Sequence, residues 1–257
     1  MKKVLGILLT VLLLFTVVGC GKKKDPVVSS DPEAKQLYVD ALAKNGEITD
    51  AHIKLDIIMV MKMEGFGSLD IISKTESWIR NSGNSDMEMI VISSAEVFGM
   101  SNTIKVYMKD GQYYLDDSIY QYKATEDEAA SYVNSSQTTA NYNLVEAASN
   151  FSAKKVDGGT EITFDVSKEA LTKLLSGQLE NETIEAAEFE EFSVKGFIDS
   201  DGYLKTMDIY VVFSVVENDI TSNVTITMNL VSEPLSDSYT FEFPDFSEFS
   251  ESNPILY

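Results

Sequence analysis

Residues 52–64 read HIKLDIIMVMKME, and this stretch decides the fold class. Every odd-numbered position from Ile53 to Met63 is apolar, whereas Lys54, Asp56 and Lys62 lie between them. An apolar residue at every second position puts one row of side chains on a single face of a β-strand. The stretch therefore predicts a long strand with one buried face.

Similar alternation recurs along the chain, and the connections between the alternating segments are short. Asp110-Gly111, between 103–109 and 112–116, is a strong hairpin signal. Because strands joined by short turns pair antiparallel, the pattern predicts an antiparallel sheet of about ten strands. The remaining strands are predicted at 69–80, 86–93, 162–166, 192–198, 203–216, 220–230 and 239–243, the last as a closing edge strand.

Four helices are predicted beside these strands, which makes the fold class α+β. The first begins with Asp31 as its N-cap and Pro32 at its first position, and it ends near Lys44. The other three are predicted at 125–133, 142–150 and 168–177.

The first twenty residues have the order of parts of an export signal. Lys2 and Lys3 precede an apolar run at 4–18, and Val17-Val18-Gly19-Cys20 follows. This arrangement resembles the lipobox of bacterial lipoproteins, in which the cysteine thiol receives a diacylglycerol and the preceding peptide is removed. The resemblance implies lipidation of Cys20 and attachment to the extracytoplasmic face of a cell membrane.

The segment after Cys20 differs in composition from the rest of the chain. Residues 21–30 are rich in lysine and serine and contain Pro26, which is typical of a flexible tether. We therefore expect a signal peptide at 1–20, a tether at 21–30 and a single domain at 31–257.

Composition excludes several classes of function. The net charge is −21 and Arg80 is the only arginine, so the chain should repel nucleic acid. Cys20 is the only cysteine and His52 the only histidine, and no nucleophile motif accompanies them. We expect a protein that is not an enzyme and that carries no cofactor and no metal.

The layout as a whole resembles the LolA/LppX-like bacterial lipoproteins, above all Gram-positive members of that group. A lipobox, a tether, one N-terminal helix and two meanders carry the likeness, the second meander being built around FIDSDGYLK at 197–205. The resemblance implies a half-open barrel, in which helices cover the concave side of one strongly curved antiparallel sheet. It also implies an apolar cavity that in some relatives carries lipid or acylated ligands.

Periodicity suggests which residues would line such a cavity. Methionine is unbranched and polarizable, so it suits a surface that adapts to variable apolar chains. The same inward alternation would also describe a filled core. The candidate residues are Leu55, Ile57, Met59, Met61, Met87, Met89, Val106, Met108, Met207, Ile209, Val211, Phe213, Ile226 and Met228.

Two functions remain open at this point. The first is a membrane-anchored binder of a lipid or another amphiphilic ligand. The second is an interaction module without a cavity. It would present the convex side of the sheet or a tyrosine-rich surface, including Tyr107 and Tyr114, to an envelope protein or a wall polymer.

Overall fold

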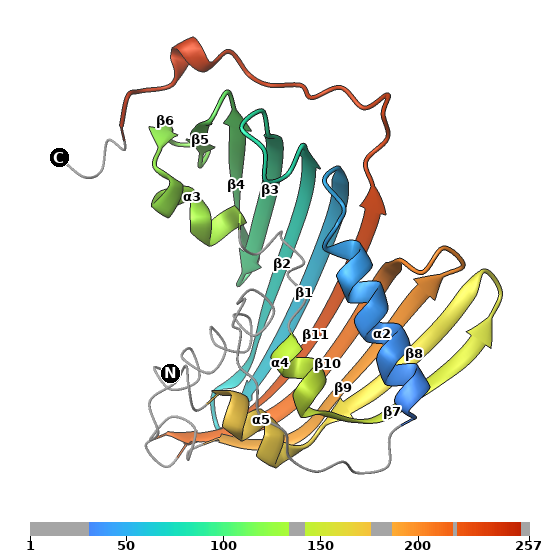
Figure 1. The fold of residues 1–257 in the computed structure, drawn as a ribbon. Coiled ribbons are helices and arrows are strands. Elements are labelled where there is room, and N and C mark those ends of the chain that lie inside the picture. Colours follow the sequence, from blue (N-terminus) through green and yellow to red (C-terminus); the bar gives the residue numbers. More distant parts are fainter. Residues whose placement is uncertain (1–30, 134–141, 176–186, 218–219, 253–257) are drawn as a thin grey trace. The chain divides into compact units, whose positions relative to one another are not determined.

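The computed structural model of the chain describes residues 31–133, 142–175, 187–217 and 220–252. Their eleven strands follow the order β6-β5-β4-β3-β2-β1-β11-β10-β9-β8-β7, in which the end strands β6 and β7 are not neighbours, so the sheet is open. The pairings from β2 to β6 and from β7 to β10 are antiparallel. In chain order the elements are α2 (Pro32–Asn45), β1 (Ala51–Met63), β2 (Gly67–Arg80), β3 (Glu88–Val97), β4 (Met100–Lys109), β5 (Gln112–Asp116), β6 (Gln121–Ala124), α3 (Glu126–Val133), α4 (Tyr142–Ala147), β7 (Ala148–Val156), β8 (Gly159–Val166), α5 (Lys168–Leu175), β9 (Ala187–Asp199), β10 (Leu204–Glu217), β11 (Ile220–Pro234) and the 3₁₀ helix η1 (Phe246–Glu248) (Figure 1).

The expected antiparallel sheet with few helices is confirmed, with eleven strands instead of about ten. The strong curvature and the covering of a concave side by helices stay predictions. No helix within the described ranges combines the length and the apolar character that crossing a membrane requires.

The described residues form two compact units that share the strands β1, β2 and β11. Unit 1 contains the described residues of 31–46, 57–70 and 142–229, and unit 2 contains those of 47–56, 71–133 and 230–252. The boundaries at 56/57, 70/71 and 229/230 therefore fall inside these strands, whereas the boundary at 46/47 lies in the turn between α2 and β1.

In unit 1, α2 lies across the strands β7 to β10 and is held at both ends (Figure 1). The Asp31 carboxylate caps its first turn by accepting from the N–H groups of Glu33 and Ala34, at 3.0 and 3.3 Å. At the other end the Asn45 side chain donates to the Leu204 carbonyl at 2.8 Å and accepts from the Leu204 N–H at 2.9 Å. These bonds satisfy backbone groups that a helix end and a strand start leave unpaired.

In unit 2, β2 to β6 form the meander that the sequence predicts. Asp110 and Gly111 make a two-residue turn, with φ angles of 53° and 74°. The next helix, α3, has a reciprocal cap: the Glu128 carboxylate accepts from the Thr125 N–H at 2.8 Å, and the Thr125 hydroxyl accepts from the Glu128 N–H at 3.3 Å.

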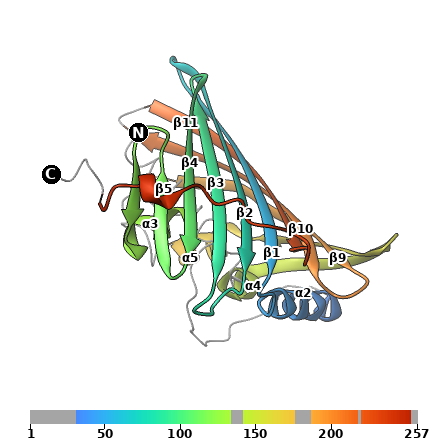
Figure 2. The same cartoon turned by 90° about the horizontal axis from the view of Figure 1, so that it is seen from above.

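The predicted edge strand at 239–243 is wrong. These residues form no strand; they cross the face of β2 to β5, as Figure 2 shows from above. Phe241 and Phe243 pack there against a cluster built around Ile90, Tyr107 and Phe249. The alternation of aromatic residues therefore reflects contact with the face of a sheet, which periodicity alone does not distinguish from strand pairing.

The predicted helix at 142–150 is also shorter than expected. The helix α4 ends at Ala147, and the edge strand β7 follows at once. Most of β7 is exposed, including Lys154 and Lys155, so the strand carries no alternation of apolar and polar residues. The short strand β6 escaped prediction for a similar reason, since four residues give too little pattern.

Candidate functional site

The fourteen predicted cavity residues divide between the two units. Ten of them are buried, whereas Leu55, Ile57, Met108 and Met207 are half-buried. Unit 1 contains Ile57, Met59, Met61, Met207, Ile209, Val211, Phe213, Ile226 and Met228, and unit 2 contains Leu55, Met87, Met89, Val106 and Met108. That they line one cavity stays a prediction.

Within unit 1 the contact between α2 and the sheet is the most distinctive arrangement. Tyr38 of α2 points onto the strands, and its ring meets Phe164 edge to face, with centroids 5.0 Å apart. Phe151 stacks on Phe164 with a centroid distance of 4.7 Å. The Tyr38 hydroxyl donates to the Met207 sulfur at 3.2 Å. We call Tyr38, Phe151, Phe164, Gly196 and Met207 the α2 layer.

Gly196 of β9 lies beside this contact. It is buried, and in the sheet it lies between Ile162 of β8 and Met207 of β10. A Cβ atom at this position would lie 3.0 Å from Leu204 Cδ1 and 3.8 Å from Tyr38 Cε2. The added atom would thus be tight against the Leu204 side chain of β10 and in ordinary van der Waals contact with Tyr38.

The Tyr38 hydroxyl is a polar group in apolar surroundings. Its burial raises the pKa of the phenol, so the group stays protonated and acts as a hydrogen-bond donor. A thioether sulfur is a weak acceptor, and a carbonyl or ester oxygen would be a stronger partner. The α2 layer therefore combines apolar rings with one buried hydrogen-bond donor. The sequence placed Tyr38 on a helix but gave no sign of its bond to Met207.

Within unit 2, five apolar residues form two neighbouring rows on one sheet face. Met89 pairs with Met108, and Val91 pairs with Val106. Val106 also pairs with Leu115, which extends that row onto β5. The short helix α3 contacts the same three strands. The sequence placed Met87 on the predicted strand at 86–93, but in the structure Met87 lies just before β3, which begins at Glu88.

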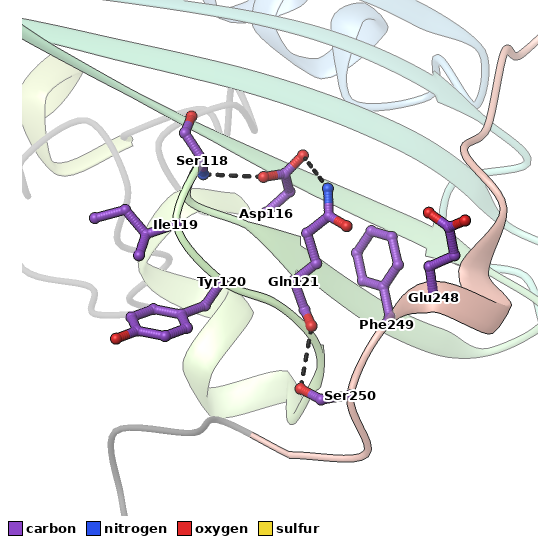
Figure 3. A pocket seen from close by; sticks show the side chains of 8 residues that line it. All are labelled: Asp116, Ser118, Ile119, Tyr120, Gln121, Glu248, Phe249 and Ser250. Carbon is purple, nitrogen blue, oxygen red and sulfur yellow. Dashed lines mark hydrogen bonds between the residues drawn. The ribbon is translucent and has the colours of Figure 1, made fainter.

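A pocket of about 620 Å³ opens elsewhere in unit 2, between the β5–β6 connection and the C-terminal segment (Figure 3). None of the fourteen predicted residues lines it. Asp116 accepts from the Ser118 N–H at 2.9 Å and from the Gln121 side chain at 3.1 Å, so its oxygens serve the connection itself. The lining residues are Asp116, Ser118, Ile119, Tyr120, Gln121, Glu248, Phe249 and Ser250.

The tyrosine-rich surface considered above is largely covered. Tyr107 is buried, and Phe243, Phe246 and Phe249 approach its ring edge to face. Trp78 is sandwiched between His52 and Tyr239 at centroid distances of 5.2 and 6.1 Å. The chain's own C-terminal aromatic residues thus occupy the face that an external partner would need.

His52 lies at the start of β1, as its position in the sequence suggested. Its Nε2 is 2.8 Å from Glu76 Oε1, and its ring stacks on Trp78. Among the residues that the structure describes, no three His, Cys, Asp or Glu side chains gather in a way that could hold a metal ion.

A comparison of the sequence with protein-family models and with curated proteins finds no match. Among solved structures, similar chains include LprF from Mycobacterium bovis, with a TM-score of 0.41 and 11% identity over 85% of this chain and 99% of that one. A DUF1329 family protein from Desulfovibrio piger has a TM-score of 0.26 and 12% identity over 84% of this chain and 96% of that one. A LolA superfamily protein from Nitrosomonas europaea has a TM-score of 0.25 and 8% identity over 80% of this chain and 94% of that one.

Proposed function

We propose that the chain is a lipid-anchored protein of the cell envelope that binds an apolar or amphiphilic ligand and catalyses no reaction. A diacylglycerol on Cys20 holds it at the extracytoplasmic face of the membrane. The ligand is a lipid or an acylated molecule, and the protein serves as its carrier, chaperone or sensor. The lipobox-like sequence before Cys20 supports the anchor.

The α2 layer supports the choice of ligand class. The hydroxyl of Tyr38 has only a thioether as its acceptor in the described hydrogen bonding, and aromatic rings surround it. Tyr38, Phe151 and Phe164 are buried beneath α2, so an amphiphile would reach them only when α2 moves away from the sheet. Its acyl chain would then lie along the apolar face, and its carbonyl oxygen would accept the Tyr38 proton. The thioether of Met207 would then be displaced, which a flexible methionine side chain permits.

A fluorescent fatty acid tests this proposal. The mature chain with Cys20→Ser is titrated with a dansyl-labelled fatty acid, and the same titration is made with Tyr38→Phe added. We expect saturable binding that the Tyr38→Phe variant weakens about tenfold, since one buried donor is lost. Tyr210→Phe, at an exposed tyrosine, should leave binding unchanged. Binding that is absent, or equal in all three proteins, would contradict the proposed role of the α2 layer.

The second function is an interaction module that presents the convex side of the sheet or its tyrosines. Its tyrosine version finds less support, because it requires an open aromatic face, whereas the rings of Phe243, Phe246 and Phe249 already cover Tyr107.

A further inference from the structure

Two turns at the same end of unit 2 expose large apolar side chains. Phe98 in the β3–β4 turn is 75% exposed, and Met100, the first residue of β4, is 71% exposed. In the β5–β6 connection Ile119 is 78% exposed beside the partly exposed Tyr120. The Ser118 hydroxyl donates to the Thr103 carbonyl of β4 at 3.3 Å, which places both turns at the start of that strand. Met100 and Thr103 are three residues apart, so the turns are separated by about 10 Å along the strand. We call these four apolar residues the apolar turn pair.

Phe98 occupies a backbone conformation that its side chain disfavours. The β3–β4 turn has φ angles of 54° at Phe98 and 73° at Gly99, nearly the same as those of Asp110 and Gly111 in the β4–β5 turn. Asp, Asn and Gly tolerate such angles, whereas a bulky residue rarely adopts them. Phe98 thus pays a conformational cost and gains almost no burial, which points to a role outside the packing of the unit.

The connection that carries Ile119 is held rigidly in its exposed position. The Asp117 carboxylate accepts from the N–H groups of Ile119 and Tyr120, at 2.9 and 2.6 Å. The Asp117 N–H in turn donates to the Tyr120 carbonyl at 3.2 Å. A connection fixed by three hydrogen bonds presents its apolar side chain to the exterior without further ordering.

The opposite end of the same strands is polar. The β2–β3 connection there exposes Asn84, Ser85 and Asp86, and the β4–β5 turn exposes Asp110. Apolar residues therefore gather at one end of the meander, in turns where polar residues would be the ordinary choice.

We propose that the apolar turn pair inserts into the surface of the lipid bilayer to which Cys20 anchors the chain. The anchor, on which this inference rests, is part of the proposed function. The ten residues of 21–30 reach at most about 35 Å, which keeps the domain near the bilayer and makes a weak insertion effective. Separate Phe, Met, Ile and Tyr side chains suit the bilayer interface, which needs no complementary shape.

The charges near the apolar turn pair predict which lipids it prefers. Neither turn contains Lys or Arg at 98–101 or 117–120. Three carboxylates, those of Glu96, Asp116 and Asp117, adjoin the turns, and one cation, Lys105, lies opposite Asp116 in the sheet. Anionic lipids would repel these carboxylates. Insertion should therefore be strongest in vesicles of phosphatidylcholine and weaker when phosphatidylglycerol is added.

Site-specific fluorescence tests the insertion, because Cys20→Ser leaves a mature chain without cysteine. A polarity-sensitive dye is attached to Ser101→Cys, next to Met100, or to Ser85→Cys at the polar end. Phosphatidylcholine vesicles should shift the emission of the first label to the blue and leave the second unchanged. If the emission of the label at Ser101→Cys does not shift when vesicles are added, the proposal is overturned, whether or not the protein binds to the vesicles.

Matched variants complete the test. Phe98→Ser, Met100→Ser and Ile119→Ser together should lower vesicle binding of the Cys20→Ser chain about tenfold. Ile58→Ser, Val156→Ser and Tyr210→Ser together remove three other exposed apolar side chains and should not change it. Equal losses of vesicle binding in both sets would contradict insertion of the apolar turn pair. A dimer of the Cys20→Ser chain that the first set of substitutions converts to monomers would show that a second copy of the chain, and not a bilayer, covers these residues. The vesicle assay contains no free ligand and no acyl anchor, so its failure leaves the proposed ligand binding and the lipidation of Cys20 to their own tests.

Discussion

Tyr114 of β5 and Phe246 of η1 stack face to face, with ring centroids 3.8 Å apart and planes inclined by 14°. Phe249 adds an edge-to-face contact to Tyr114 at 5.6 Å. The neighbouring Ser250 is tied to β6, since its N–H donates to the Gln121 carbonyl at 2.9 Å and its carbonyl accepts from the Lys123 N–H at 2.8 Å. The C-terminal segment is therefore part of the fold of unit 2.

Removing the Phe249 ring should destabilise unit 2. The residue is 6% exposed and meets three other rings, so Phe249→Ala should lower the free energy of unfolding by about 3 kcal/mol. Urea unfolding measures the change. Phe66→Ala, at a ring that is 71% exposed, is the matched control and should change stability by less than about 0.5 kcal/mol. Equal effects of the two substitutions would mean that the segment does not hold to the sheet.

Acid should loosen the same segment through Asp245. The Ser247 N–H donates to the Asp245 carboxylate at 3.0 Å, and this bond, with that of the Ser247 side chain, lowers the pKa of Asp245 below its ordinary 3.8. A lowered folded-state pKa stabilises the folded protein above the unfolded-state value, and the contribution is lost as the pH falls through the folded-state value.

Asp245→Asn isolates this contribution. The variant should be less stable than the wild type at pH 7, and the difference should shrink once the pH falls below the ordinary pKa of 3.8. Urea unfolding at a series of pH values measures it. Two curves that stay parallel down to pH values where aspartate is protonated would contradict the role assigned to Asp245.

Phe98→Asn should stabilise the protein. Asn tolerates the positive φ of 54° at this position, and little burial is lost because Phe98 is 75% exposed. We expect a gain of about 0.5 to 1 kcal/mol in the free energy of unfolding, measured in urea. Asp110→Phe places the same ring in the matching turn and should cost a similar amount. A loss of stability in Phe98→Asn would show that the ring contributes to packing.

Cys20→Ser should release the protein from the membrane. The substitution removes the thiol that would receive the diacylglycerol, and no other cysteine can replace it. After cell fractionation, the wild type should sediment with membranes and carry the mass of a diacylglycerol on the fragment that begins at Cys20. A wild-type fragment without added mass would contradict the proposed anchor.

The strands that alternate could be predicted because each has one buried face. The strand predicted from residue 52 onward matched β1, and Asp110-Gly111 correctly marked the turn between β4 and β5. Both signals are local in the sequence. The strand β7 could not be predicted, because most of its residues, including Lys154 and Lys155, are exposed and show no apolar alternation. Phe241 and Phe243 gave a wrong prediction for the opposite reason: they alternate with polar residues but belong to no paired strand.

The candidate site was predictable only in part. Burial of Met59 and Met89 followed from alternation, whereas the bond between Tyr38 and Met207 joins residues 169 positions apart and has no local signal. The positive φ of Phe98 was equally hidden, because its sequence, Phe-Gly, lacks the Asn or Asp that usually marks such a turn.

We propose above that the anchored chain holds an apolar or amphiphilic ligand. Native mass spectrometry of the protein, extracted from its own membrane in mild detergent, detects such a ligand by its mass. We expect a non-covalent adduct with the mass of a lipid or an acylated molecule, present on the wild type and depleted on Tyr38→Phe. A wild-type protein that carries only its covalent diacylglycerol, and that gains no mass when lipids are added, would rule out ligand binding.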